Sequence, residues 1–465
     1  MVGWGPHVSK KVAAGSLRRP GGRPALRIGN SGRRLLVASA LAVAFASGCG
    51  SRAPQRPDVV LIVVDSLRAD HLSHQGYEFP TAAGLDAFRA DAALFTRTFA
   101  PTPSCVPSVG SLLTGLYPLR HRLGREERLA PDVPTLASRL REAGYATLGL
   151  SQHSRVSAAT GLDRGFDRFE STRSGLLESP DAGEAVAFVR ELLARDPPRP
   201  FFLYLHLMNV HGPYRVPPDR QSELLGRPPG QLLRYGDPLM RRVLRGDAGA
   251  RAEISTAHVR SLTEQYDTAA RYTLDRVAEI LRLLEHAGVY RNALIVVTAD
   301  HGDELFEHGS FSHGSTLYRE VLQVPFYLKR PGVADGRRFD DPVALLDVMP
   351  TVLDLLGLAP VPGDGRSLAP QLRGEPVRPD SRALLHELPG DPGELRAITA
   401  GRYKLISRTG PAGRARRELY DLVLDPRESA DIAAAGGELV KELSDRLDAA
   451  FAALAAPPSA AEPAP

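Results

Sequence analysis

The sequence predicts an α/β fold, with a doubly wound, mostly parallel sheet flanked by helices and then a small antiparallel sheet with a helix. Three observations predict this fold class. Apolar runs alternate along the chain with amphipathic stretches, as strands and helices do around a parallel sheet. The 465 residues suffice for one large domain and a small one. The 43% apolar and 24% charged residues exclude a multi-pass membrane protein, a collagen and a disordered chain.

Three apolar runs predict strands that are buried on both faces. They cover Asp58–Val64, Phe201–Leu207 and Ala293–Thr298. Amphipathic stretches predict helices, which we expect at Thr135–Ala143, Glu184–Arg195, Glu264–Ala287 and Leu345–Leu356. Residues 215–260 are rich in Arg and Pro and lack clear strands, so we interpret them as an insertion or a lid.

The pattern of apolar segments and turn residues changes from about Arg382 onward. Short segments separated by turn residues predict a small antiparallel sheet, with strands at Leu395–Ala400, Tyr403–Ser407 and Glu418–Leu422. A helix is expected from about Glu438 to Leu454. The predicted organisation is therefore a main domain over residues 58–380, a C-terminal subdomain over 381–456 and a Pro/Ala-rich, disordered tail over 457–465.

The N-terminal 49 residues have the pattern of an export signal. Residues 1–34 are basic, and the apolar run Leu35–Ser47 is shorter than the roughly 20 residues that a membrane-spanning helix needs. The run ends in Ala46-Ser47-Gly48-Cys49, which resembles a bacterial lipoprotein signal with a lipid-bearing Cys49 and a tether over 50–57. Location in the periplasm or on the cell surface follows. A plain secretory signal and a cytosolic protein remain the alternatives.

Charge and cysteine content exclude several classes of protein. Residues 1–49 hold eight Lys or Arg and no acidic residue, and the rest of the chain has 50 basic against 54 acidic residues. Nucleic acid is therefore not an expected partner. The two cysteines exclude a disulfide framework and a cysteine-rich zinc module.

Two predicted strands end in carboxylates. The first runs into Asp65-Ser66, and the third into Asp300-His301-Gly302-Asp303. Ligands of open α/β sheets bind beyond the carboxyl ends of the strands, so Asp65, Asp300 and His301 are expected to converge there. Two carboxylates and an imidazole suit a divalent cation. The alternative is that either Asp only caps the following helix.

Cys105 precedes a predicted helix whose first turn contains Pro107 and whose end is marked by Gly115. The cysteine would lie at the helix N-terminus, where the positive end of the helix dipole favours an anion. The alternative is that Cys105 is a small buried apolar residue.

These motifs together resemble the sulfatase family of the alkaline phosphatase superfamily. They are Cys105-Val-Pro-Ser with Ser111-Leu-Leu-Thr-Gly-Leu-Tyr-Pro118, the strand ending in Asp65, Thr298-Ala-Asp-His-Gly-Asp-Glu304, Glu307-His308-Gly, His313-Gly, Leu317-Tyr-Arg-Glu320 and Glu418-Leu-Tyr-Asp-Leu422. The resemblance spans about residues 57–450 and implies an alkaline phosphatase-like fold.

In this family the motif cysteine is converted to formylglycine by a formylglycine-generating enzyme, and its hydrate attacks the sulfate. The resemblance thus implies that Cys105 is the nucleophile precursor. Four implied metal ligands are Asp65, Cys105, Asp300 and His301, with Ca²⁺ expected and Mg²⁺, Mn²⁺ or Zn²⁺ possible. His211 resembles the substrate-side histidine and His313 a leaving-group acid or oxyanion contact, unless either is an ordinary surface or core histidine.

Several positions depart from the family pattern. Val109 replaces the arginine of Cys-x-Pro-x-Arg, and Ser66 replaces the second acid of the usual Asp-Asp pair. Gln152 and Ser315 stand where lysines are usual. Lys329, the lysine nearest to the motifs, is expected at the surface, and arginines within 215–260 are candidates to compensate for the missing charge.

Three functions therefore stay open. The first is a sulfuric ester hydrolase with formylglycine at 105. The second is a metal-dependent phosphodiesterase, phosphonate ester hydrolase or phospho-group transferase of the same superfamily. The third is a sulfatase-like binding protein with a degraded site. The expected substrate is a sulfated or phosphorylated small molecule, glycan or lipid.

Overall fold

A computed structural model describes residues 56–172, 181–228, 232–376, 382–388, 394–410 and 413–456. The predicted signal peptide (1–49), the tail (457–465) and all but residues 56 and 57 of the predicted tether lie outside this range. Within it, every helix is too short or too polar to cross a membrane.

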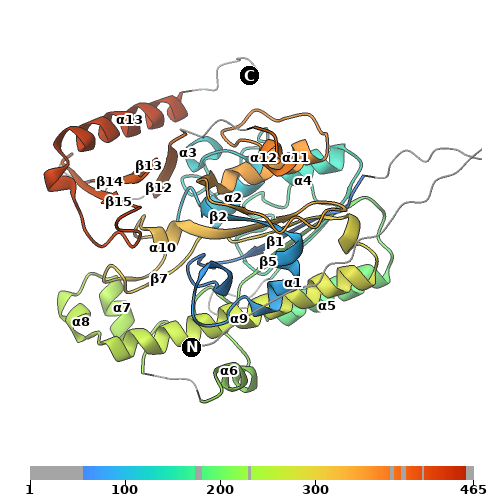
Figure 1. Ribbon diagram of the computed structural model, residues 1–465, viewed down its shortest axis with the longest axis horizontal. Coiled ribbons are helices and arrows are strands. Elements are labelled where there is room, and N and C mark those ends of the chain that lie inside the picture. The colour runs from blue at the N-terminus through green and yellow to red at the C-terminus, as the bar shows by residue number, and fades with distance from the viewer. Residues whose placement is uncertain are drawn as a thin grey trace, which may run out of the picture. The chain divides into compact units, whose positions relative to one another are not determined.

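A nine-stranded sheet forms the centre of the fold, in the order β10-β2-β9-β6-β1-β5-β3-β4 with β11 also paired to β2 (Figure 1). Only β9 runs antiparallel to its neighbours, so the prediction of a mostly parallel sheet is confirmed. The strands are β1 (Val59–Val64), β2 (Ala93–Phe99), β3 (Ala146–Ser151), β4 (Arg168–Ser171), β5 (Phe201–Leu207), β6 (Leu294–Thr298), β9 (Gln323–Lys329), β10 (Arg338–Phe339) and β11 (Val343–Ala344). A separate pair, β7 (Glu304–Leu305) and β8 (Phe311–Ser312), follows β6.

Helices cover both faces of the sheet. Figure 1 shows α2 (Cys105–Thr114), α4 (Leu136–Glu142), α11 (Val348–Leu355) and α12 (Ala369–Arg373) on one side, and α5 (Ala182–Ala194) and α9 (Thr256–His286) on the other. Short helices α1 (Asp86–Asp91), α3 (Pro118–His121) and α10 (Arg319–Leu322) lie in the connections. Helices α4, α5 and α11 agree with the predicted helices to within three residues at each end.

The long helix α9 begins eight residues before the predicted Glu264. Ser255 caps it, because its hydroxyl accepts a hydrogen bond from the backbone N–H of His258. The first turns of α9 are largely exposed, so they carry no apolar stripe from which the start could be predicted.

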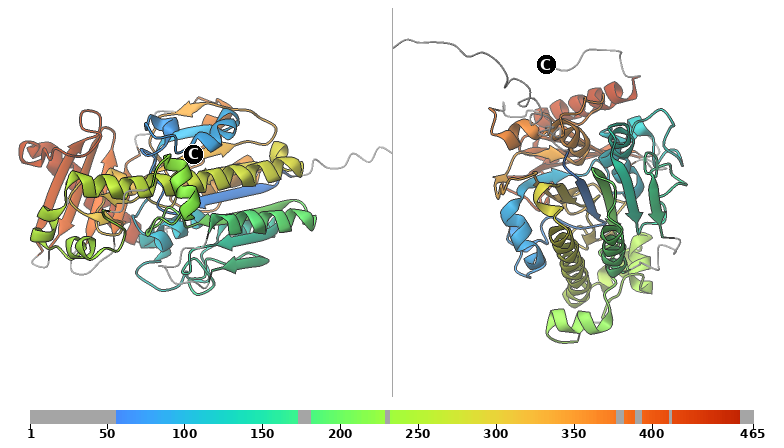
Figure 2. Two further views of the ribbon diagram at one scale, coloured as in Figure 1. Left: turned by 90° about the horizontal axis from the view of Figure 1, so that it is seen from below. Right: turned by 90° about the vertical axis from the view of Figure 1, so that its right-hand side faces the viewer.

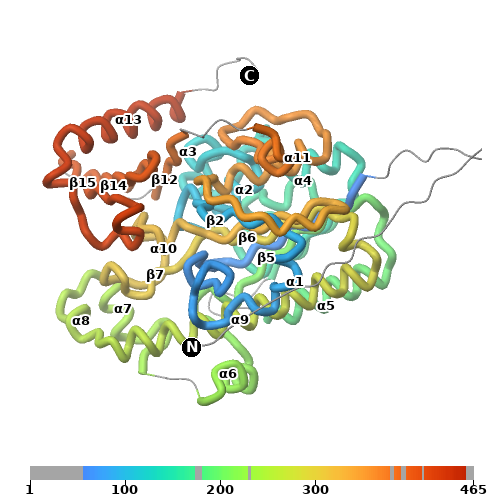
Figure 3. Tube along the Cα trace, viewed as in Figure 1, coloured from blue at the N-terminus to red at the C-terminus, as the bar shows by residue number. Residues whose placement is uncertain are grey.

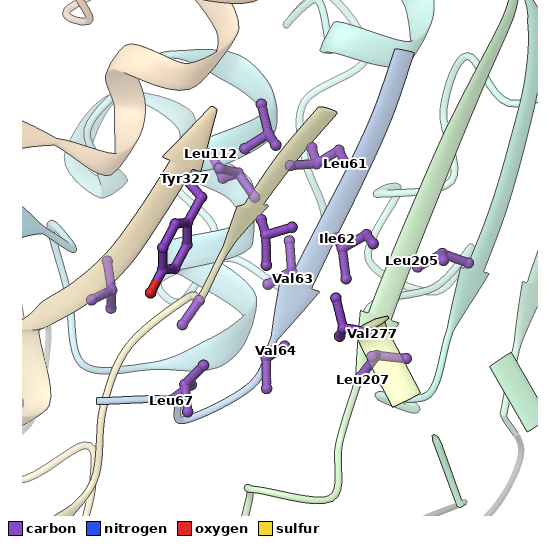
Figure 4. Packing of buried hydrophobic residues seen from close by; sticks show 14 of the residues in the cluster. Leu61, Ile62, Val63, Val64, Leu67, Leu112, Leu205, Leu207, Val277 and Tyr327 are labelled. Carbon is purple, nitrogen blue, oxygen red and sulfur yellow. The ribbon is translucent and has the colours of Figure 1, made fainter. Parts of the chain in front are cut away.

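Strand β1 lies at the centre of the hydrophobic core, with all six residues buried. Figure 4 shows Leu61, Ile62, Val63 and Val64 among side chains from the flanking elements, including Leu112 of α2, Val277 of α9 and Tyr327 of β9. Burial on both faces explains why the strand reads as a continuous apolar run. It also fixes the position of Asp65, the next residue.

The predicted insertion folds into three short helices: α6 (Pro218–Leu225), α7 (Pro238–Leu244) and α8 (Ala248–Glu253). The described residues of 215–260 hold no strand, as expected. In the tube view, the chain from β7 to α10 passes between α7 and α8 on one side and the C-terminal sheet on the other (Figure 3).

The C-terminal part forms a four-stranded antiparallel sheet with one helix, which confirms the predicted fold of this part. Its strands are β12 (Leu384–Leu388), β13 (Leu395–Ala400), β14 (Tyr403–Thr409) and β15 (Ala415–Asp421), and α13 (Gly437–Ala455) packs against β13 and β14. A second hydrophobic cluster joins them to Phe99, Tyr117 and Leu322 of the main sheet and its connections. Figure 2 shows the C-terminal sheet and helix, in red and orange, from two further sides. Strand β12 was not predicted.

Candidate active site

Three adjacent parallel strands bring the predicted ligands to one edge of the sheet. Val63 of β1 pairs in register with His206 of β5 and Thr298 of β6. Asp65 and Asp300 therefore follow their strands at the same level, as the carboxyl-end rule predicts. His301 completes the group, with its Nε2 3.8 Å from Asp65 Oδ1 and 3.6 Å from Asp300 Oδ2.

Ser66 holds these two carboxylates side by side. Its backbone N–H donates to Asp300 Oδ1 at 3.1 Å, and its hydroxyl donates to Asp65 Oδ1 at 2.9 Å. The residue adopts φ of 61°, which turns the chain sharply at the end of β1. Ser66 thus positions both acids, at the position where the resemblance implies a second acid.

Cys105 is the first residue of α2, as predicted, and Gly115 ends the helix in the left-handed conformation with φ of 69°. The Cys105 sulfur lies 3.1 Å from His301 Nε2 and 3.9 Å from Asp65 Oδ1. One turn further along α2, the Ser108 hydroxyl donates to the backbone carbonyl of Asp300 at 2.6 Å. This bond fixes the helix N-terminus against the loop that carries the acids.

His313 faces the same sulfur, with its Nε2 3.8 Å away from Cys105 Sγ. Its other nitrogen, Nδ1, lies 2.9 Å from Asp303 Oδ1, and Asp303 also accepts a short hydrogen bond from the Tyr214 hydroxyl. Burial alone would lower the pKa of His313, but Asp303 outweighs burial and raises it. Asp303 and Tyr214 therefore orient His313 and favour its protonated form, a role the sequence did not assign.

His211 belongs to the same group, because its ring centroid lies 4.9 Å from that of His313. Its Nδ1 donates to the carbonyl of Gly212 at 2.8 Å. His301 makes the same type of bond, from Nδ1 to the carbonyl of Gly302 at 2.8 Å. A carbonyl oxygen only accepts, so each neutral ring keeps its lone pair on Nε2, which is the form that binds a metal or a proton.

Two further histidines at this edge were missed by the sequence analysis. His206 stands near the end of β5, and His153 follows Gln152, with their rings stacked at 5.9 Å. Nδ1 of His153 accepts backbone N–H bonds from Arg155 and Val156, and burial lowers the pKa of His153 to about 3. His153 comes two residues after β3, which is a signal that the sequence offered, whereas His206 lies inside the apolar run of β5.

The carboxylates carry the strongest sign of a cation site. Asp65 Oδ2 and Asp300 Oδ2 are buried and make no hydrogen bond. Burial and the charge of Asp65 raise the pKa of Asp300. Burial also opposes ionisation of Asp65, but His211, His206 and His301 outweigh it and hold the pKa of Asp65 well below its ordinary value.

The ligand atoms of Asp65, Cys105, Asp300 and His301 all lie within 4.8 Å of one another. Unpaired carboxylate oxygens beside an imidazole lone pair fit a divalent cation, because its charge offsets both the repulsion and the burial. The four residues that the resemblance implied therefore lie together in a suitable arrangement.

In the part of the chain that the structure describes, no lysine supplies positive charge at this site. The three lysines of the described residues are engaged elsewhere, Lys404 with Glu428 and Lys441 with Asp445. Lys329 is 3% exposed, so its predicted surface position is wrong. Its ammonium donates to the carbonyls of Arg291 and Arg330, near the opposite edge of the sheet, which its long apolar stem allows.

The other departures have structural roles. Val109 is wholly buried in the hydrophobic core. Gln152 bridges two backbone groups, donating to the carbonyl of Asp181 and accepting from the N–H of Met208. In 215–260, arginines that were candidates to compensate pair with acids: Arg220 with Glu223, Arg227 with Glu264 and Arg242 with Asp247.

A family profile described as Sulfatase matches residues 57–358, which include every residue of the site. The chain belongs to the sulfatase family. A second profile, described as N-sulphoglucosamine sulphohydrolase, C-terminal, matches residues 306–453. Family membership identifies this chain as a sulfuric ester hydrolase.

Individual relatives are distant. A delta 4,5-hexuronate-2-O-sulfatase of Bacteroides thetaiotaomicron is 25% identical over 428 residues, covering 83% of this chain and 86% of the relative. Among solved structures, a phosphonate monoester hydrolase of Agrobacterium radiobacter has a TM-score of 0.70 at 21% identity, covering 86% of this chain and 96% of its own. A protein in complex with its substrate D-glucosamine-2-N,6-O-disulfate has a TM-score of 0.71 at 18% identity, covering 86% and 98%. The two structures support the alkaline phosphatase-like fold.

Proposed function

We propose that this protein hydrolyses a sulfate ester with a formylglycine made from Cys105 and one divalent cation held by Asp65, Asp300, His301 and residue 105. One observation carries the proposal: Cys105 opens α2 directly against two buried carboxylates whose outer oxygens make no hydrogen bond. The nucleophile precursor therefore lies beside residues that fit a cation. When bound, the cation would polarise the sulfate oxygens and favour ionisation of the attacking hydroxyl.

The chain's own groups supply nucleophile and proton. One hydroxyl of the formylglycine hydrate loses its proton and attacks the sulfur, and the bond from sulfur to the substrate alcohol breaks. His313, whose protonated form Asp303 favours, donates a proton to the departing alkoxide. The second hydroxyl then loses its proton, the carbon–oxygen bond to the sulfate breaks, and the aldehyde returns with release of sulfate. His211, beside His313, would contact the substrate.

Phosphoester or phosphonate ester hydrolysis is the second candidate. The observation that favours it is the engagement elsewhere of all three lysines in the described residues, together with a buried Val109 at the arginine position. His313, whose protonated form Asp303 favours, then supplies positive charge beside Cys105 in addition to the cation. A degraded binding site is disfavoured, because loss of cation binding would leave Asp65 and Asp300 buried without compensation.

The proposed substrate is a sulfated small molecule or glycan. The relatives that support this choice include the hexuronate sulfatase and the structure with a disulfated glucosamine. A lipid sulfate is the remaining option from the sequence. Ca²⁺ is the cation that the family resemblance favours.

Mass spectrometry of the tryptic peptide Thr98–Arg120, from protein purified from its own host, tests the nucleophile. We expect an aldehyde at position 105, seen as a lighter peptide that reacts with a hydrazide probe. The same sample is assayed on 4-nitrophenyl sulfate, a phenylphosphonate monoester and a phosphodiester. Unmodified cysteine throughout would contradict the formylglycine, and turnover of the phosphorus esters alone would establish the second candidate.

We also propose that the protein is exported and held on a membrane by a lipid on Cys49. The apolar run before this cysteine supports the proposal. Labelled fatty acid should be incorporated by the full chain in its host, and a Cys49→Ser variant should incorporate none and leave the membrane fraction. Incorporation by the variant, or its absence in the full chain, would refute the anchor.

A further inference from the structure

His206 lies beside the two carboxylates of the predicted cation site. It is wholly buried on β5, and its Nε2 lies 3.2 Å from Asp65 Oδ2 and 4.0 Å from Asp300 Oδ2. None of these three atoms makes a hydrogen bond of acceptable geometry. His206 Nε2 therefore lies beside two buried carboxylate oxygens that, like it, make no hydrogen bond, although each such atom would cost about 1–3 kcal/mol if left unsatisfied.

Tyr204 orients the His206 ring. It lies two residues earlier on the same face of β5, and its hydroxyl is 3.3 Å from His206 Nδ1. When Nδ1 carries the ring proton, it donates to this hydroxyl and the lone pair of Nε2 faces the two carboxylates. A hydrogen-bonded outer nitrogen and a free inner nitrogen are the usual arrangement of a metal-binding histidine.

The chain has lost one ligand position, and His206 lies where it can compensate. The family resemblance implies an acidic ligand at position 66, but Ser66 uses its hydroxyl to hold Asp65 at 2.9 Å. His206 reaches the same two carboxylates from the neighbouring strand β5, through the register of Val63 with His206.

We propose that His206 Nε2 is a further ligand of the active-site cation and replaces the acidic side chain that is missing at position 66. This inference rests on the metal site of the proposed function. With His206 and His301, the donor set holds two imidazole nitrogens beside two carboxylates. Nitrogen donors favour Mn²⁺ or Zn²⁺ over Ca²⁺, which prefers an all-oxygen site, so the inference shifts the expected cation from Ca²⁺ to a transition metal.

Nitrogen coupling to bound Mn²⁺ tests the proposal on the unmodified full chain, without any variant. Pulsed electron paramagnetic resonance should detect two histidine nitrogens on the manganese, from His206 and His301. In His206→Ala the number should fall to one, and calorimetric titration should give a Kd for Mn²⁺ weaker by at least ~10-fold. The Kd for Ca²⁺ should change less.

A matched control is His153→Ala. The ring centroid of His153 lies 5.9 Å from that of His206, and Nδ1 of His153 already accepts two hydrogen bonds from backbone N–H groups. This variant should keep both nitrogen couplings and the affinity for Mn²⁺. Adding Ser66→Asp to His206→Ala should restore cation binding and turn the preference toward Ca²⁺, which a general folding defect would not do. Circular dichroism of the metal-free variants checks the fold.

The outcomes separate the two proposals. One nitrogen on the manganese of the unmodified chain, or an unchanged Kd in a folded His206→Ala variant, overturns the role of His206 and leaves the metal site intact. No Mn²⁺ or Ca²⁺ binding to the unmodified chain overturns the metal site of the proposed function as well.

Discussion

Two clusters in this chain combine acidic residues with histidine. They differ in whether their polar atoms have hydrogen-bond partners. At the sheet edge, Asp65, Asp300 and His206 each present a buried atom without a hydrogen bond. In the second cluster, the ligand atoms of Glu304, His308 and Glu320 lie within 4.8 Å of one another. There, however, His308 Nδ1 bonds Glu320 at 2.6 Å and Nε2 donates to the carbonyl of Glu428 at 2.9 Å.

The acids of the second cluster have partners too. Glu304 accepts from the N–H of Ser310 and the hydroxyl of Thr316, and Glu320 accepts from His308. Next to the cluster, the side chain of Glu428 is paired with the buried Lys404 at 2.8 Å. His308 therefore joins the segment after β7 to the loop after β15 and has no lone pair to offer a cation. Composition and proximity do not distinguish a metal site from a structural ion network, whereas unpaired buried atoms do.

The largest difference between the clusters should appear on removing one acid from each. In Asp300→Ala we expect metal binding to be lost and activity to fall by at least ~10³-fold, because a nucleophile site without its cation loses most of its electrostatic stabilisation. Glu320→Gln should bind Mn²⁺ as the unmodified protein does and lose stability instead. Calorimetric titration and steady-state kinetics measure both. Retained activity in a folded Asp300→Ala variant would remove the metal assignment.

His313 should show the next largest effect. His313→Asn should lower kcat by about 10²–10⁴-fold for esters of poorly acidic alcohols, because these leaving groups need a proton. For 4-nitrophenyl sulfate the loss should be small, since nitrophenolate leaves without one. Rates across a series of phenyl sulfates give this dependence. An equal loss for every leaving group would instead assign His313 to binding the sulfate oxygens.

Cation binding should stabilise only through the sheet-edge cluster. At a Mn²⁺ concentration of 100 times Kd, linkage adds about 2.7 kcal/mol to the free energy of unfolding. Thermal unfolding with Mn²⁺ and after chelation measures this difference. The gain should vanish in Asp300→Ala and persist in Glu320→Gln, so a gain that disappears in Glu320→Gln would place a cation in the second cluster.

The second cluster should respond to pH. The hydrogen bond and charge of Glu320 outweigh burial and raise the pKa of His308 to about 9. A histidine whose pKa rises on folding stabilises fully below the unfolded value of ~6.5 and loses this contribution as pH rises through about 9. His308→Gln should therefore be less stable by about 1.5–3 kcal/mol near pH 6.

The difference between the unmodified protein and His308→Gln should close as pH rises past 9. Urea unfolding at several pH values checks this trend. A difference that stays constant with pH would mean that packing, and not the charge of His308, stabilises this junction.

Much of the site followed from the sequence because strand ends can be located in it. The apolar runs before Asp65 and Asp300 give buried parallel strands, whose carboxyl ends share an edge. Pro107 and Gly115 delimit α2 and so place Cys105 at its start. His206 was not predicted as a site residue because it lies inside the apolar run of β5. Its closeness to Asp65 depends on the pairing of β5 with β1.

The sequence by itself determined the fold class, the family and the convergence of Asp65, Asp300, His301 and Cys105, since these depend on local pattern and strand order. Only the tertiary structure decided what each polar atom faces. The register of β1 with β5 sets His206 against Asp65, the turn at Ser66 aligns two acids, and Asp303 aims His313 at Cys105. Hydrogen-bond partners distant in sequence are fixed by packing, so no local pattern encodes them.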